Sequence, residues 1–69
     1  MKILFTILKT LRKQKHITQR ALADALHISQ TSVSKYERGE TEPDIDMIIK
    51  IADYFEISID EFLRKYYEP

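Results

Sequence analysis

The sequence predicts an all-α protein, a compact bundle of five helices. Three observations support this fold class. Apolar residues recur at intervals of three and four, Ser, Thr or Asp precedes several of the apolar runs, and the 69 residues include only one glycine and two prolines. No segment shows the alternation of a half-buried strand, and no repeat or low-complexity tract is present. We therefore expect residues 1–69 to form one domain.

The first three expected helices are short. The first covers about residues 3–15, where isoleucines and leucines form a single apolar stripe. The second covers residues 18–26 and the third residues 29–37, with Thr18 and Ser29 as their N-caps. The brief connections between them predict helices that pack directly against one another.

Two further helices follow the only clear loop, residues 39–43, where Gly39 can take the positive φ that ends a helix. Asp44 is the expected cap of the fourth helix. Its predicted inner face consists of Ile45, Ile48, Ile49, Ala52 and Phe55, widened by Met47 and Ile51. Ser58 and Glu61 have the spacing of a capping box at the start of the fifth helix. That helix continues through Ile59, Phe62, Leu63 and Tyr66.

The formal net charge of zero conceals two oppositely charged halves. Residues 1–38 hold eight basic and two acidic residues, a charge of +6, whereas residues 39–69 hold three basic and nine acidic residues, a charge of −6. Such a polarised charge distribution can orient a molecule toward a polyanion such as DNA. An unevenly charged, solvated surface is the alternative, and composition alone does not decide between the two.

Composition also excludes several classes of protein. Without cysteine, the chain has neither a disulfide framework nor a thiolate zinc site, which favours the cytoplasm. No apolar run approaches the roughly 20 residues that cross a bilayer. The basic residues between positions 9 and 15 interrupt the outline of a secretory signal. We expect a cytoplasmic protein that uses no cofactor and does not bind a membrane.

The third expected helix is unusually polar. Val33 and Tyr36 are its only apolar pair, and its other residues include Gln30, Thr31, Ser32, Ser34 and Lys35. Ser and Thr compete for backbone hydrogen bonds, so this helix contributes little intrinsic stability. Two short helices with a brief turn between them, the second one polar, have the form of a helix-turn-helix motif, which places its second helix in the major groove of DNA.

Residues 17–39 closely resemble the Cro/phage-repressor-like (XRE) helix-turn-helix family. The resemblance extends through Pro43 and residues 48–52 to residues 57–63, so it covers almost the whole chain. It implies a lambda-repressor-like domain of five helices, with the motif at about residues 18–38. It also implies a transcriptional regulator that binds double-stranded DNA, in the first instance a repressor that binds a palindromic operator as a homodimer.

The resemblance also implies roles for individual residues. Gln19, at the start of the second helix, matches a phosphate-binding position of the family. The positions that face the groove are Gln30, Thr31, Ser32, Ser34 and Lys35. Glutamine amides suit adenine, lysine suits guanine and the threonine methyl suits thymine, so we rank Gln30 and Lys35 first. A merely solvated polar face is the alternative interpretation.

Two arginines complete the expected site. In the family, an arginine of the first helix pairs with the glutamate that ends the recognition helix. Arg12 and Glu37 match these positions, which implies a structural ion pair, with Arg12 able to share a phosphate as well. Arg38 follows near the expected path of the DNA backbone, so a phosphate contact is expected there.

The sequence departs from the family's pattern in two places. His27 stands in the turn where the family usually has glycine, so the turn must accept a larger residue in or near the left-handed region. Glu40 and Glu42 lie in a loop that approaches phosphate with neutral or basic residues in many relatives. We expect weaker attraction to the DNA backbone at this loop.

The sequence is compatible with more than one partner and more than one function. The apolar residues late in the chain, Ile59, Phe62, Tyr66 and Tyr67, suggest a dimer surface. The main alternative is an antitoxin-like module whose acidic half neutralises a partner protein and which also regulates its own promoter. An enzyme or a metal site is not expected, because His16 and His27 are isolated and no catalytic arrangement of side chains is recognisable.

Overall fold

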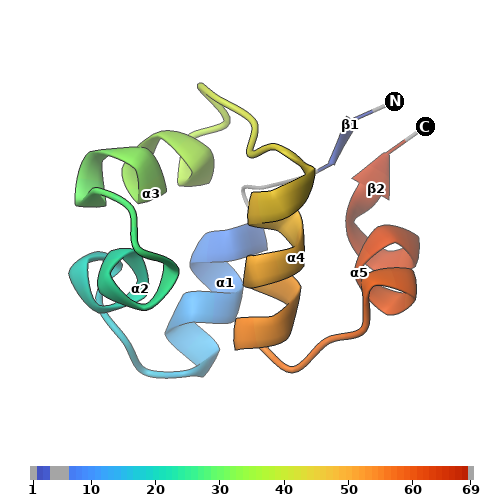
Figure 1. Cartoon of the computed structure of the whole chain (residues 1–69), viewed down its shortest axis with the longest axis horizontal. Coiled ribbons are helices and arrows are strands. Elements are labelled where there is room, and N and C mark those ends of the chain that lie inside the picture. Colours follow the sequence, from blue (N-terminus) through green and yellow to red (C-terminus); the bar gives the residue numbers. More distant parts are fainter. Residues whose placement is uncertain (1, 4–6, 69) are drawn as a thin grey trace.

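Five helices and one short strand pair make up the described part of the chain (Figure 1). The computed structural model describes residues 2–3 and 7–68, with side chains from residue 7 to residue 65. The helices are α1 (Ile7–Gln14), α2 (Gln19–Leu26), α3 (Gln30–Glu37), α4 (Ile45–Tyr54) and α5 (Ile59–Tyr66). The strand β1 (Lys2–Ile3) pairs in antiparallel fashion with β2 (Tyr67–Glu68). The predicted all-α architecture of five helices is confirmed.

The start of the first helix differs from the prediction. The sequence predicts a helix from about residue 3, but Ile3 lies in β1 opposite Tyr67, and α1 begins at Ile7. Leu4, part of the predicted apolar stripe, lies outside the described residues. The prediction of a helix at Ile3 is wrong because its backbone pairs with a distant strand. A ladder of two residues is too short to produce a recognisable period.

Three of the four connections between helices share one local design. Each ends with a left-handed residue, an isoleucine and a Ser or Thr that caps the next helix. These endings are His16-Ile17-Thr18, His27-Ile28-Ser29 and Glu56-Ile57-Ser58. The left-handed residues have φ values of 59°, 59° and 57°. The caps accept hydrogen bonds of 3.0–3.1 Å from the backbone N–H three residues later.

The isoleucine closes each of these turns. Its N–H donates to a carbonyl five residues earlier: Ile17 to Arg12 at 3.3 Å, Ile28 to Ala23 at 3.0 Å and Ile57 to Ala52 at 2.9 Å. This bond is the mark of a Schellman motif, in which an apolar residue follows the left-handed one and packs back on the helix. All three isoleucines are half-buried against the core. The expected geometry of the turn at His27 is therefore present, and it recurs at two other sites.

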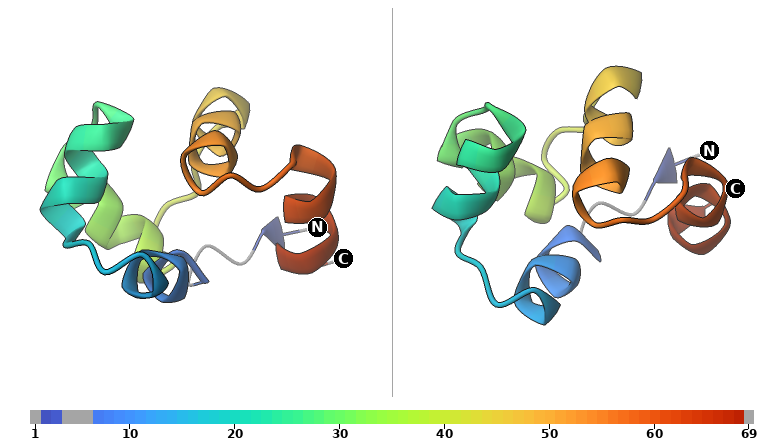
Figure 2. Two further views of the ribbon diagram at one scale, coloured as in Figure 1. Left: turned by 90° about the horizontal axis from the view of Figure 1, so that it is seen from below. Right: turned by 60° about the horizontal axis from the view of Figure 1, so that its bottom comes forward.

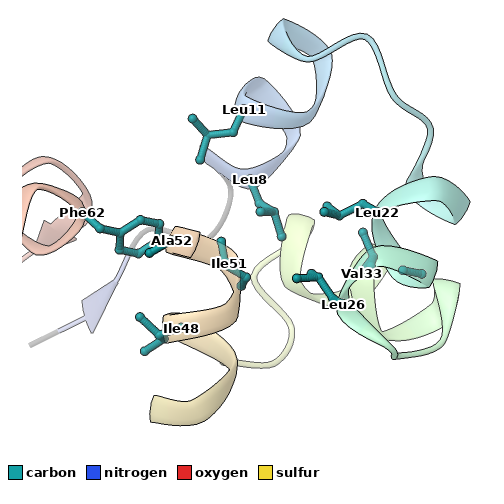
Figure 3. Close-up of a cluster of buried hydrophobic side chains, with 10 residues drawn as sticks. Leu8, Leu11, Leu22, Leu26, Val33, Ile48, Ile51, Ala52 and Phe62 are labelled. Atoms are coloured by element: carbon teal, nitrogen blue, oxygen red, sulfur yellow. The ribbon is translucent and has the colours of Figure 1, made fainter. Parts of the chain in front are cut away.

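The core lies between the two ends of the molecule. Figure 2 shows α2 and α3 together at one end and α5 with β1 at the other, with α1 and α4 between them. The buried apolar side chains come from all five helices (Figure 3). They are Leu8, Leu11, Leu22, Ala23, Leu26, Val33, Ile48, Ile51, Ala52 and Phe62.

The buried face of α4 differs from the predicted one. Ile48, Ile51 and Ala52 are buried, but Ile45 and Ile49, which we predicted on the same inner face, are 71% and 42% exposed. Apolar residues surround most of α4, so their periodicity could not select the face that packs. Ile48, Ile51 and Ala52 are spaced at i, i+3 and i+4, and this stripe meets the other helices.

The predicted dimer surface also needs correction. Phe62 is 1% exposed and packs in the monomer core beside Ala52 (Figure 3), so it is not available to a second copy. Ile59 is half-buried against the same core. The side chains of Tyr66 and Tyr67 lie outside the described residues. The prediction for Phe62 is wrong because a core this small needs the large aromatic ring for itself.

Candidate nucleic-acid interface

Helices α2 and α3 form a helix-turn-helix at one end of the molecule (Figure 1). The turn between them is the connection at His27, whose left-handed backbone ends α2 and lets Ser29 cap α3. Val33 is fully buried and Tyr36 half-buried, which fixes the inner side of α3. Gln30, Thr31 and Lys35 are exposed on its outer side.

The structure brings five of the predicted site residues together. They line an open hollow of about 320 Å³ between the start of α2 and the outer side of α3, which we call the α3 hollow. Its lining residues are Gln19, Gln30, Thr31, Ser34 and Arg38. Gln30, Thr31 and the neighbouring Lys35 are exposed, whereas Ser34 is half-buried. Lys35 does not line the hollow, but it is exposed on the same helix.

A buried ion pair anchors the C-terminal end of α3. The side chain of Glu37 is only 4% exposed and that of Arg12 is 12% exposed. Arg12 Nε donates to Glu37 Oε2 at 2.8 Å, and Arg12 Nη2 donates to Oε1 at 3.3 Å. Arg12 Nη1 also donates to the backbone carbonyl of Ile17 at 3.0 Å. Because this bidentate geometry occupies the guanidinium on three sides, Arg12 is placed as an anchor of α3 and has little surface left for a phosphate.

Gln19 belongs to the same network. Its Nε2 donates to Glu37 Oε1 at 3.1 Å, which ties the first residue of α2 to the last residue of α3. An amide nitrogen carries two hydrogens, so one remains for an acceptor in the α3 hollow. Sequence reasoning paired Glu37 with Arg12 only. The spacing of 18 residues between Gln19 and Glu37 carries no local signal for this second bond.

Two residues of the predicted site have other engagements. The hydroxyl of Ser32 lies 3.0 Å from the hydroxyl of Ser29, within the N-cap of α3. Arg38 contacts the hydroxyl of Ser34 and forms an ion pair with Glu40 across Gly39. The Arg38 side chain remains 56% exposed. A partner anion at Arg38 would therefore compete with Glu40.

The aromatic residue of α3 stays uncharged. Burial raises the pKa of Tyr36, and the Asp44 carboxylate raises this pKa further. Its phenol is therefore protonated at physiological pH and adds no negative charge beside the exposed Lys35 and Arg38. This leaves the outer side of α3 compatible with a polyanion.

Among the described residues, no group of three or more His, Cys, Asp or Glu side chains is arranged to hold a metal ion. None of the described helices combines the length and apolar character required to span a membrane.

The fold and this geometry define a helix-turn-helix domain, and comparisons with known proteins agree. Residues 8–62 match the family described as Helix-turn-helix. The chain belongs to this family.

Individual relatives bear related names. The chain is 47% identical over 55 residues to the cryptic phage CTXphi transcriptional repressor RstR of Vibrio cholerae, a match that covers 80% of the chain and 49% of that protein. It is 39% identical over 56 residues to the HTH-type transcriptional activator BcrR of Enterococcus faecalis, covering 81% and 28% respectively. The chain thus spans about half the length of the first relative and less than a third of the second.

A solved structure with DNA is also similar. The P22 c2 repressor protein, crystallised in complex with synthetic operator 9T, superposes with a TM-score of 0.77 at 26% sequence identity. The match covers 90% of this chain and 94% of that one. The fold is therefore one that contacts an operator in a related protein.

Proposed function

We propose that this chain is a sequence-specific regulator of transcription that binds double-stranded DNA by inserting α3 into the major groove. One observation carries the proposal: the outer side of α3 is polar and uncharged apart from Lys35, while Glu37 holds the helix from behind through Arg12 and Gln19. Thr31, Ser32 and Ser34 lower the intrinsic stability of α3, so this composition is not explained by stability alone. A helix that reads bases requires polar side chains on its outer side.

The exposed side chains of α3 supply the base contacts. The amide of Gln30 can bond both the N6 and N7 edge of adenine, and the ammonium of Lys35 suits the O6 and N7 acceptors of guanine. The Thr31 methyl group suits the methyl group of thymine. Ser34 lies deeper in the α3 hollow and Ser32 within the cap, so we assign both a smaller part in specificity.

Gln19 and Arg38 supply the backbone contacts. Both line the α3 hollow, one at the N-terminus of α2 and the other at the end of α3. A phosphate between them would meet the second amide hydrogen of Gln19, the positive end of the α2 dipole and a guanidinium. Binding would exchange the Arg38–Glu40 ion pair for an Arg38–phosphate pair. Phosphate contacts of this kind position the protein and carry no sequence information.

We further propose that two copies bind a palindrome and repress. The domain measures 29 × 24 × 20 Å, whereas half-sites in a palindrome lie one helical turn, about 34 Å, apart. One copy therefore reads only one half-site. Since Phe62 is buried, the large apolar residues between positions 7 and 65 that are exposed and can serve a second copy are Ile45, Ile49 and Leu63. Sedimentation that shows a monomer both free and on operator-length DNA would remove this part of the proposal.

The central proposal is tested by DNA binding at several salt concentrations. Sites are first selected from a random duplex pool, and the Kd for the selected site is then measured between 50 and 200 mM salt. A protein that contacts six or more phosphates loses about 1,000-fold in affinity over this range. We expect a steep slope and a clear preference for the selected site over a scrambled duplex. A flat slope, or equal affinity for both duplexes, would contradict the proposal and favour a protein-binding module of the antitoxin kind.

A further inference from the structure

A second open hollow lies away from α3. It has a volume of about 410 Å³ and lies where the end of α1 meets the connection between α4 and α5. Its lining residues are Leu11, Gln14, Lys15, Phe55, Ile57 and Lys65, and we call it the Lys15 hollow. It shares no residue with the α3 hollow, so the proposed DNA contacts do not account for it.

Lys15 is held in a fixed position at the rim. Its Nζ donates to the backbone carbonyl of Tyr54 at 2.9 Å, at the C-terminal end of α4. The same ammonium lies 4.3 Å from the centre of the Tyr54 ring and 5.8 Å from that of Phe55. One of its three N–H groups is used by the carbonyl, so two remain. Within residues 7–65, no carboxylate forms an ion pair with Lys15.

The remainder of the hollow combines apolar surface with a second cation. Leu11 is buried, and Phe55 and Ile57 are half-buried, so their exposed atoms supply an apolar floor. Lys65 lies at the rim and pairs with Glu61 at 3.0 Å in an exposed i, i+4 arrangement. Small-molecule sites characteristically combine an apolar lining with a few placed polar groups.

We propose that the Lys15 hollow binds a small carboxylate with an apolar body. The carboxylate lies on the ammonium of Lys15, where a pre-positioned cation saves the entropy of ordering a free lysine. The apolar body lies on Leu11, Phe55 and Ile57 and removes their exposed surface from water. A neutral molecule of the same shape should bind more weakly because it forms no ion pair with Lys15. An inorganic anion should also bind more weakly because it leaves the apolar surface of the hollow exposed to water.

The experiment is an amide NMR titration of the whole chain with sodium phenylacetate, with phenylacetamide as the matched neutral probe. We expect saturable shifts centred on residues 11–15, 55–57 and 65. Because the amide replaces a charged hydrogen-bond acceptor by a neutral one, it should bind about tenfold more weakly. Inorganic phosphate should give no saturable shift in this region. No DNA is present, so failure here leaves the proposed DNA binding untouched.

Lysine variants test whether the ammonium group of Lys15 binds the carboxylate. Lys15→Met should weaken phenylacetate binding about tenfold, since it removes the charged donor and keeps an apolar side chain. Lys9→Met removes an exposed lysine of α1 that does not line the hollow and should leave the affinity unchanged. If Lys15→Met does not fold, Lys65→Met replaces it, with a weaker but measurable loss expected. Equal binding of the two probes, equal loss in Lys9→Met, or shifts without saturation would overturn the proposal.

Discussion

Helices α3 and α4 are both amphipathic, yet they are held in opposite ways. Helix α4 is held by apolar packing, with Ile48, Ile51 and Ala52 in the core. It still exposes Ile45. Helix α3 buries one aliphatic side chain, Val33, and otherwise relies on the charged anchor at its C-terminal end. The difference teaches that an ionic anchor can replace apolar packing where the outer side of a helix must remain polar.

Removing the Arg12–Glu37 ion pair should have the largest effect, a loss in the free energy of unfolding. Glu37→Ala leaves the guanidinium of Arg12 buried without a counter-charge, which costs about 4 kcal/mol of the free energy of unfolding. Urea unfolding followed by circular dichroism measures the loss. The matched control is Glu40→Ala, which breaks an exposed ion pair of the same chain and should cost about 0.5 kcal/mol. Similar losses in the two variants would show that Glu37 does not anchor α3.

The two faces of α4 should respond differently to the same truncation. Ile51 is fully buried, so Ile51→Ala removes core contacts and should cost about 3 kcal/mol in the same unfolding measurement. Ile45 is 71% exposed, and Ile45→Ala should change the free energy of unfolding by less than about 0.5 kcal/mol. A large loss in Ile45→Ala would mean that this isoleucine is covered in solution.

Lysines on the two helices should differ in their effect on DNA. Lys35→Ala should reduce the preference at one base pair by about 1–3 kcal/mol, measured as the ratio of Kd values for the selected site and its single-base variants. Lys50→Ala removes the same charge from an exposed position on α4, outside the helix-turn-helix, and should leave that ratio unchanged. If Lys35→Ala weakens all duplexes alike, Lys35 contacts the phosphate backbone.

The smallest effect is expected at the turn between α1 and α2, which lies outside both α3 and α4. His16 has a φ of 59°, a region that costs a residue with a Cβ atom about 1 kcal/mol and that glycine enters freely. His16→Gly should relieve this cost. The expected gain in the free energy of unfolding is only about 0.5 kcal/mol, because glycine loses more chain entropy on folding than histidine does. His16→Ala keeps the Cβ atom and should bring no gain. A loss of stability in His16→Gly would mean that the histidine side chain makes a stabilising contact.

Features that depend on neighbouring residues were predictable from the sequence. Thr18, Ser29 and Asp44 are N-caps because a short oxygen side chain before an apolar run satisfies the free N–H groups of the next helix. The left-handed turn at His27 was expected from the family pattern. The pairing of Arg12 with Glu37 was also expected from the family, and residue types alone would not have selected it.

Features that depend on tertiary packing were not predictable in this way. The buried face of α4, the burial of Phe62 and the pairing of Ile3 with Tyr67 follow from contacts between distant segments. The bond from Gln19 to Glu37 belongs to the same group. A local signal did exist for the left-handed residues at His16 and Glu56. Each is followed by Ile and then Ser or Thr, the same order as at His27.

The strand pair has a consequence for how the chain can be rearranged. Because Lys2 lies opposite Glu68, a short peptide could link β1 directly to β2 without crossing the molecule. New ends could then be opened at the exposed residues Thr41 and Glu42, in the loop before α4. Such a circular permutant would keep every helix intact while changing the order in which they leave the ribosome, with α4 and α5 made before the helix-turn-helix.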